Sequence, residues 1–280
     1  MPRENTAADR AGRLLGYAGL GLLALFVLVP LLATVLGGLK TLGELRQNPF
    51  GLPLHPRWSN LTSILSGARY WRLLGNSLLV AGFVTAITVM LAGMAAFVLA
   101  HIRFFGREML MGYLMLGLMF PAATAMLPLF IQIRDLGLLD SYAGLVLAEV
   151  AFSLSMSVLL FRNFFRQLPP ELFDAAKMDG CGYTRMYFAI TLPLCRPIVT
   201  TVAIVTFVTS WNNYLLPLLL LDSPGRYTWP LGIMDYQGQY STEWQLVLAF
   251  ITLTILPAVL VFVLAQRHIV AGLTAGAVKG

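Results

Sequence analysis

The chain has 280 residues, of which 58% are hydrophobic and only 11% are charged, and its formal net charge is +6. A soluble domain carries about 25% charged residues, so lipid must cover most of the surface of this chain. Its 19 Lys and Arg residues form no basic run but flank apolar segments, which favours a membrane protein and excludes a nucleic-acid-binding stripe.

Six charge-poor runs follow in chain order, and each is long enough to cross a bilayer, which takes about 20 apolar residues. They are Leu14–Leu39, Leu73–Ala100, Met109–Ile133, Ser141–Phe161, Pro197–Leu221 and Trp244–Gln266. A cleaved signal peptide is the alternative for the first run, but its 26 uncharged residues exceed a signal-peptide core and no small-x-small cleavage site precedes Lys40. We expect an all-α polytopic membrane protein with six transmembrane helices.

The distribution of Lys and Arg predicts the orientation. With the N-terminus inside, the inner segments hold 12 of these residues and the outer segments 7. We therefore expect both termini to be cytoplasmic. The expected organisation is a cytoplasmic N-terminus at 1–13, transmembrane helix 1 at 14–39, an extracytoplasmic loop at 40–72, a five-helix core at 73–266 with a cytoplasmic loop at 162–196, and a cytoplasmic tail at 267–280.

The inner loop at 162–196 is unusual because it is charged and rich in alanine. Pro169 and Pro170 end the preceding helix and can open a new one, since proline fits the first helical turn. Gly180 is a stop signal. The pattern predicts a helix of about nine residues and about 14 Å, which is too short to be stable alone and must pack on something.

The pair Ala175–Ala176 in this short helix lets another surface approach its backbone closely. Acidic residues surround the pair at Glu171, Asp174 and Asp179. One interpretation is a docking helix for a soluble partner, which passes a push into the fifth span. The alternative is an interfacial helix that lies on the lipid headgroups.

The spacing in this loop resembles the EAA loop of ATP-binding cassette (ABC) importer permeases. The matching residues are Asp174-Ala175-Ala176, then Gly180 after three residues, and later Ile190-Thr191-Leu192-Pro193. The family usually has Glu at the first position, so Asp174 keeps the charge with a shorter reach. Trp211 to Pro217 (WNNYLLP) resembles a segment of the carbohydrate branch, Asn76-Ser77 also fits, and the tail from Gln266 resembles the end of the maltose-type second permease.

This resemblance implies a type I importer permease fold (MetI-like) in the bacterial inner membrane. The helix within residues 170–182 would be a coupling helix that docks on a cytoplasmic ATPase, with the contacts Glu171, Asp174, Ala175, Ala176, Asp179 and Gly180. The implied partners are a second, related permease, two copies of the ATPase, which bind ATP and Mg, and an extracytoplasmic solute-binding protein. The chain itself is expected to bind no cofactor.

The resemblance also points to the end of the chain. Gly272, Leu273 and Thr274 are a second expected contact with the ATPase pair. The alternative is a frayed terminus.

Polar residues inside membrane spans usually face the bundle interior or a cavity, because they are costly in lipid. The fifth span carries Trp211, Asn212, Asn213 and Tyr214, whose amides could bond sugar hydroxyls and whose rings could stack on a pyranose. Pro217 is expected to permit a kink there. The alternative role for the asparagines is bonding between helices.

Glu149 is the one carboxylate within a span, where it costs roughly 2.5–3.5 kcal/mol near the helix centre. It could accept a substrate hydroxyl or pair with the partner permease. It could equally be a protonated buried acid or reach the interface.

Enzyme chemistry is not expected. The lysines Lys40, Lys177 and Lys279 stand in no phosphate-binding loop, the histidines form no H-E-x-x-H pair, and Cys181 and Cys195 suffice neither for a metal site nor, on the cytoplasmic side, for a disulfide. A self-sufficient secondary transporter is a rival hypothesis, and so is a glycerol-phosphate importer permease. No basic cluster marks an anion site in the spans, which favours a neutral sugar.

Overall fold

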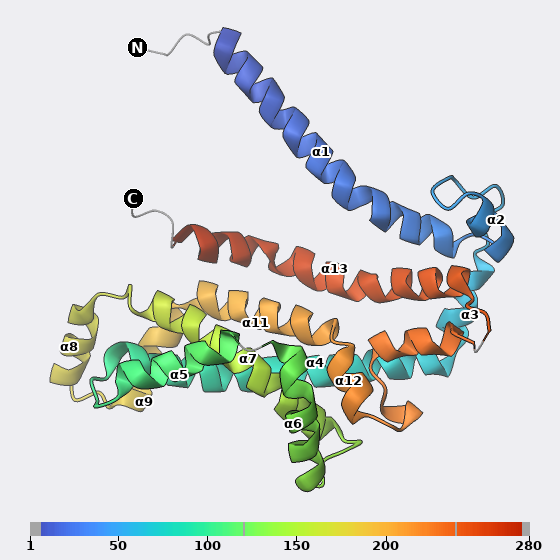
Figure 1. Ribbon diagram of the computed structural model, residues 1–280. Helices are drawn as coiled ribbons and strands as arrows, with labels where there is room; N and C mark the ends of the chain where they lie inside the picture. The colour runs from blue at the N-terminus through green and yellow to red at the C-terminus, as the bar shows by residue number, and fades with distance from the viewer. Residues whose placement is uncertain (1–6, 120, 239, 276–280) are drawn as a thin grey trace. The chain divides into compact units, whose positions relative to one another are not determined.

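The computed structural model describes residues 7–119, 121–238 and 240–275, and it is helical almost throughout (Figure 1). The longer helices are α1 (Ala7–Gly38), α4 (Ala68–His101), α5 (Arg107–Met119), α6 (Ala122–Asp135), α7 (Tyr142–Phe165), α11 (Arg196–Trp211) and α13 (Trp244–Ala275). Short elements connect them: α2 (Leu42–Gln47), α3 (Ser59–Ser66), α8 (Pro170–Met178), α9 (Tyr183–Arg185), the π-helix Met186–Thr191, α10 (Leu192–Leu194), α12 (Leu215–Leu220), and two 3₁₀ segments, Pro224–Arg226 and Trp229–Tyr236. Over these ranges the only β pairing is one isolated bridge between Gln237 and Thr242, so the all-α prediction is confirmed.

The six predicted runs all fall on these helices. In the described residues α1, α4 and α7 are each long and apolar enough to cross a membrane, and two bent pairs qualify when each is taken as one span. One pair is α5 with α6, and the other is Tyr183–Leu194 with α11. Helix α13 is apolar over Trp244–Leu260 and continues to Ala275, so the predicted tail at 267–275 is helical backbone; residues 276–280 lie outside the described residues.

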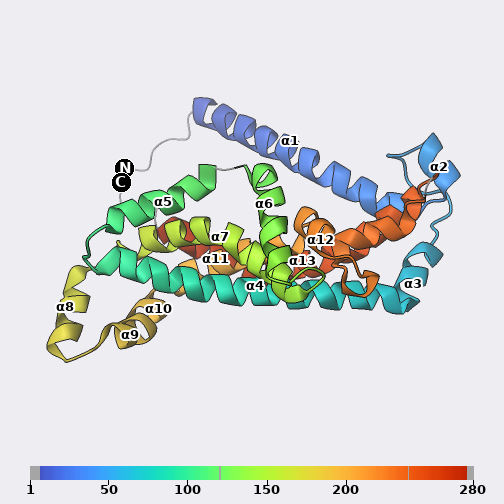
Figure 2. The same cartoon turned by 60° about the horizontal axis from the view of Figure 1, so that its bottom comes forward.

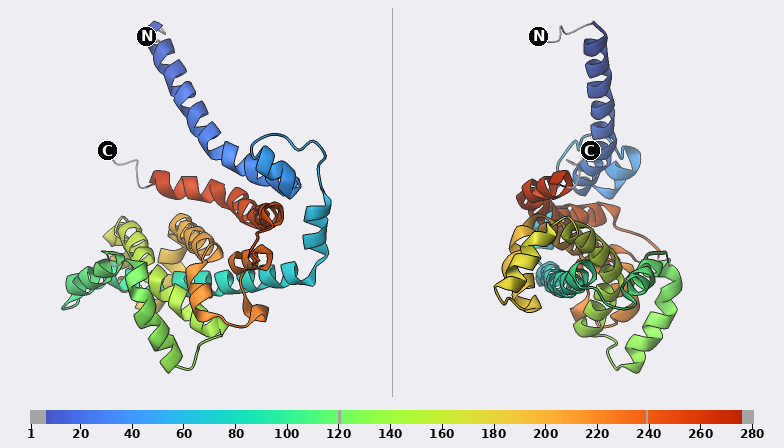
Figure 3. Two further views of the ribbon diagram at one scale, coloured as in Figure 1. Left: turned by 45° about the vertical axis from the view of Figure 1, so that its right-hand side comes forward. Right: turned by 90° about the vertical axis from the view of Figure 1, so that its left-hand side faces the viewer.

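The chain forms two compact units, and the first consists of Met1–Ala68 and Ile233–Ile255. Within it Gly38 lies against α13 so closely that a Cβ there would stand 2.7 Å from the Ala249 Cα atom. The loop expected at 40–72 contains the short helices α2 and α3 (Figure 3). Lys40 is fully buried and its Nζ donates to the carbonyls of Asn48 at 2.7 Å and Pro49 at 3.3 Å, which closes the loop on itself.

The second unit consists of Arg69–Gly232 and Leu256–Gly280. Helices α4, α5, α7 and α11 run alongside one another, α6 turns away from them, and α8 to α10 lie together at one end (Figure 2). The apolar core is concentrated in two clusters. One gathers around Phe161 and Phe165 of α7 and includes α8, and the other gathers around Leu145 of α7 and includes α12.

Two spans are interrupted. Pro121 stands at the N-cap of α6, and α5 and α6 meet at 105°. Pro128 lies inside α6.

The kink expected at Pro217 is displaced. The fifth span breaks at 212–214, and Pro217 occupies the first turn of α12, where its ring is tolerated. The break is stabilised by Asn213, whose Oδ1 accepts from the Leu216 N–H at 3.3 Å at the start of α12.

Polar contacts hold the loop at 222–229 onto the helix ends. Asp140 has a left-handed backbone (φ 50°) and accepts from the N–H groups of Asp222 and Ser223 at 3.1 and 2.9 Å and from Arg226 Nη1 at 2.7 Å. These bonds, with that of the Ser223 hydroxyl foremost, lower the pKa of Asp140 to about 2. Asn76 Nδ2 donates to the carbonyls of Gly225 and Tyr227 at 3.0 and 2.9 Å. The N-terminal ends of α4 and α7 therefore share one loop.

Candidate functional site: the α8 helix and the polar seam between α7 and α11

Helix α8 spans Pro170–Met178, so the predicted nine-residue helix is confirmed. Pro169 stands at its N-cap and Pro170 at its first position, and Gly180 follows its end with φ +74°, a backbone conformation that glycine adopts without a Cβ penalty. Glu171 lies in the first turn and Lys177 in the last, each at the end of the helix dipole that stabilises its charge. Local sequence thus explains where α8 begins and ends.

An aromatic cluster supplies the packing that so short a helix needs. Phe173 of α8 is 5% exposed and its ring lies 3.9 Å, centroid to centroid, from the imidazole of His101 and 6.3 Å from Phe97, both on α4. Tyr187 of the π-helix lies 5.5 Å from Phe97 on the same side. We call Phe97, His101, Phe173 and Tyr187 the aromatic seat. It joins α8 to α4, whereas the sequence had suggested a connection to the fifth span alone.

The opposite face of α8 is open. Leu172, Ala175 and Met178 follow one another at helical spacing and are exposed, with Met178 at 88%. The predicted contact residues Glu171, Asp174, Asp179 and Gly180 are also exposed. Ala176 is different: it is buried in the core of its own chain, because the turn that places Phe173 inward places the residue three positions later inward too. The prediction that both alanines face a partner is therefore wrong for Ala176.

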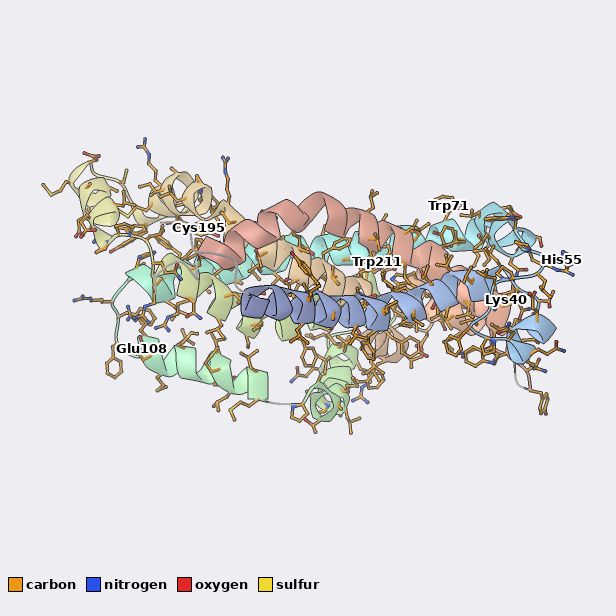
Figure 4. The ribbon with its side chains drawn as sticks, turned by 90° about the horizontal axis from the view of Figure 1, so that it is seen from above. Lys40, His55, Trp71, Glu108, Cys195 and Trp211 are labelled. Carbon is orange, nitrogen blue, oxygen red and sulfur yellow. The ribbon has the colours of Figure 1, made fainter. Side chains whose placement is uncertain are left out.

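An ion pair connects α7 and α5 at the end of the second unit that carries α8. Arg162 of α7 is buried, and its Nη2 donates to both carboxylate oxygens of Glu108 at 2.8 and 2.9 Å while its Nε donates to the Leu99 carbonyl at 3.2 Å. Figure 4 shows Glu108 at the beginning of α5 and Cys195 at the beginning of α11, both toward the end that carries α8. The ends of α4, α5 and α7 are thus connected beside the helix.

A second polar group lies inside the bundle and involves Glu149, which is only 3% exposed. Its Oε1 accepts from Asn213 Nδ2 at 3.1 Å, and its Oε2 accepts from the Ser210 hydroxyl. We call Glu149, Ser210 and Asn213 the polar cluster. It ties the middle of α7 to the break after α11, so both carboxylate oxygens have donors within the chain.

The remaining predicted pathway residues are not gathered at one surface. Trp211 is 1% exposed, and its ring stacks on Phe207 and lies near Trp229, so it offers no accessible surface to a sugar. Its place is at the far end of α11 from Cys195 (Figure 4). Asn212 is exposed, but its amide donates to the carbonyl of Val208 in its own helix at 2.9 Å. Tyr214 is exposed at the break.

A groove lined by four hydroxyl side chains and five apolar ones lies next to the polar cluster and was not predicted; we call it the hydroxyl-lined groove. It is about 250 Å³ in volume, and its polar lining consists of Ser153 and Ser157 of α7 and Thr206 and Thr209 of α11. Ser153 stands one turn beyond Glu149, and Thr206 one turn before Ser210. The sequence contains the signal, since serine and threonine recur at helical spacing on both spans, but only the packing of α7 on α11 shows that the two stripes face each other.

Backbone alone is described for Gly272, Leu273 and Thr274, which lie in the last turns of α13. The prediction that they contact a partner remains a prediction.

Comparisons with known proteins agree on one family. The model of the family described as "Binding-protein-dependent transport system inner membrane component" matches residues 87–274. The chain is 33% identical over 278 residues to the diacetylchitobiose uptake system permease protein NgcG of Streptomyces coelicolor, covering 99% of this chain and 92% of that one. It is 33% identical over 270 residues to the arabinooligosaccharides transport system permease protein AraQ of Halalkalibacterium halodurans, covering 95% of each.

A solved structure shares the fold. It is that of a bacterial ABC transporter involved in the import of the acidic polysaccharide alginate, with a TM-score of 0.80, 23% identity, and coverage of 94% of this chain and 98% of that one.

Proposed function

Because the chain belongs to the family of binding-protein-dependent transport system inner membrane components, we propose that it is one of two different permease subunits in an ABC importer that carries a sugar or oligosaccharide inward. ATP hydrolysis would reside on two copies of a separate cytoplasmic ATPase, and a solute-binding protein would deliver substrate from outside. The relatives named above, which are permeases for diacetylchitobiose and arabinooligosaccharides, support this substrate class.

The observation that carries the proposal is the two-sided construction of α8. Its inward face, Phe173 and Ala176, is buried in the permease, and its outward face, Leu172, Ala175 and Met178, is exposed and apolar with acidic residues beside it. An amphipathic helix that already has a seat on one side and leaves the other side free suits docking in a groove of a soluble subunit. Movement of the ATPase would then reach α4 through the aromatic seat as well as α11 through the π-helix.

The neighbouring residues Ala175 and Ala176 provide a test of this docking and its control, because one side chain is exposed and the other is buried. In the assembled importer, with Cys181 replaced by Ser, we expect Ala175→Cys to form a cross-link with a cysteine in the ATPase cleft. Ala176→Cys should not react, since this position is buried. Absence of any cross-link from Ala175→Cys in an intact, ATP-hydrolysing complex would contradict the docking model.

We further propose that the hydroxyl-lined groove between α7 and α11 forms part of the translocation pathway. Hydroxyl groups can exchange hydrogen bonds with sugar hydroxyls, and none of the residues that line the groove is charged. This composition favours a neutral sugar over the glycerol-phosphate alternative, which would call for cations. The secondary-transporter hypothesis is disfavoured by Glu149, because both its oxygens are engaged within the chain.

Removing hydroxyl groups from both helices tests the pathway. Ser153→Ala with Thr206→Val should reduce uptake of the sugar without reducing the amount of assembled complex. Thr200→Val on the same helix is the control, because Thr200 does not line the groove and its hydroxyl bonds its own backbone. Equal uptake by both variants would refute the assignment, and calorimetry of the cognate binding protein against a sugar panel would identify the substrate.

A further inference from the structure

A basic pocket of about 630 Å³ lies between the end of α4, the start of α5 and the inner side of α8. Four cationic side chains line it, and Asp174 is the one carboxylate among the lining residues. The cations are Arg103, Arg107, Arg166 and Lys177. The pocket therefore presents an excess of positive charge next to the helix that is proposed to dock the ATPase.

Part of this charge is not neutralised within the chain. Lys177 pairs with Asp174 at 3.2 Å, and Arg107 pairs with Glu108 at 3.0 Å. Arg103 and Arg166 make no ion pair with any residue in the described part of the chain, and both are exposed to the pocket. Two guanidinium groups, each with several donors, are thus left for an anion from outside.

An apolar groove of about 140 Å³ continues from the basic pocket. The two share Ile102 and Tyr183, and the groove extends between α4 and the π-helix past Met94, Val98 and Phe188. A site for an anion with an apolar groove beside it has the chemistry that a phospholipid requires. Beside it the loop from α4 to α5 exposes the whole of the apolar Phe105 side chain.

We propose that an anionic phospholipid of the cytoplasmic leaflet binds here, with its phosphate between Arg103 and Arg166 and one acyl chain in the groove along α4. Basic pockets between helices on the cytoplasmic side are suited to anionic headgroups. The bound lipid would bridge α4 and α8 and support the aromatic seat from the membrane side. This inference rests on the proposed function only through the expected cytoplasmic location of the loop at 162–196, and not on the docking of an ATPase or on the substrate.

An acidic segment of the ATPase is the competing occupant. The exposed apolar face of α8, at Leu172, Ala175 and Met178, already supplies a docking surface, and it lies on the side opposite Phe173, which lines the pocket. The apolar groove has no use in binding an acidic peptide. The structure thus favours a lipid.

The test is native mass spectrometry of the purified full-length chain with phosphatidylglycerol or phosphatidylcholine of the same acyl length. The wild-type chain should retain one phosphatidylglycerol in preference to phosphatidylcholine. Arg103→Gln with Arg166→Gln should weaken this binding about 30-fold, since each cation near an anionic lipid contributes about 5-fold. Arg185→Gln with Arg196→Gln is the matched control, because it removes the same charge from exposed positions that do not line the pocket.

Further measurements distinguish a phospholipid from free phosphate and from an acidic segment of the ATPase. Val98→Trp fills the groove without changing charge and should lower the affinity for long-chain but not for short-chain phosphatidylglycerol. Displacement of the lipid by excess inorganic phosphate, or equal loss of binding in the control pair, would overturn the proposal. Protection of Arg103 and Arg166 by the ATPase subunit in the absence of lipid would assign the pocket to the protein partner instead. None of these measurements involves transport, so their failure is separable from failure of the proposed function.

Discussion

The aromatic seat makes a quantitative prediction for Phe173→Ala. Phe173 and Ala176 are the two buried side chains of α8, so the substitution removes most of the packing that holds this helix. Truncating a buried Phe costs about 3–5 kcal/mol, and the lost stacking on His101 accounts for about 0.5–1.5 kcal/mol of such a loss. Nine residues cannot maintain a helix in water alone, so α8 should open locally while the membrane helices stay folded.

Amide hydrogen exchange measures this opening directly. A loss of about 3 kcal/mol corresponds to a change of more than 100-fold in the opening equilibrium, so amides of α8 should exchange at least about 100-fold faster than in the wild type. Amides of α7 should keep their protection. In the assembled importer the same variant should hydrolyse ATP without moving sugar, because the docked helix no longer transmits force to α4.

Leu172→Ala is the control for this experiment, since it shortens the neighbouring side chain on the exposed face of the same helix. Its amides should exchange at nearly the wild-type rate. Wild-type protection of α8 in Phe173→Ala, or equally fast exchange in both variants, would refute the claim that the aromatic seat holds the helix.

Three further predictions concern other contacts. A Cβ atom at Gly93 would overlap the Tyr187 hydroxyl and lie 3.5 Å from the ring Cζ, so Gly93→Ala should lower the stability by about 1–3 kcal/mol. Adding Tyr187→Phe should restore most of this stability, and additive losses in thermal melts of the double variant would contradict the overlap. Folding lowers the pKa of Asp140 to about 2, so its ionised form stabilises the protein fully above the unfolded pKa near 3.8, and this stabilisation is lost as pH falls toward 2. The Tm of the wild type should therefore exceed that of Asp140→Asn by less and less between about pH 4 and 2. A Tm difference that does not change with pH would exclude this linkage. Glu149→Leu leaves the donors of Ser210 and Asn213 unpaired and should lower the stability by about 1–3 kcal/mol for each donor. Glu149→Gln keeps an acceptor and should have a Tm closer to that of the wild type. Equal Tm values for the two variants would argue against the polar cluster.

Much of the helical architecture could be predicted from local pattern. Apolar runs must form helices in lipid because each backbone polar group needs a partner, so the spans follow from composition alone. The bounds of α8 follow from Pro169, Pro170 and Gly180 for equally local reasons. The break before α6 has a similarly local cause, since Pro121 stands at the N-cap of that helix.

The candidate site was predicted less completely, and the misses share a cause. Ala176 and Trp211 were expected at open surfaces, yet both are buried, since burial depends on which neighbours a helix face meets. His101 escaped notice because nothing in its surroundings along the chain points to Phe173, more than 70 residues later. The hydroxyl-lined groove likewise depends on the register between α7 and α11.

Chain-local chemistry was therefore sufficient for the number of apolar runs, their helical state and the existence of a short amphipathic helix in the loop at 162–196. Long-range packing was needed to show which side of that helix is occupied, where the fifth span breaks and which polar groups meet. The physical reason is that hydrogen bonding within a helix and turn chemistry act over about four residues, whereas the aromatic seat and the polar cluster join residues more than 60 positions apart.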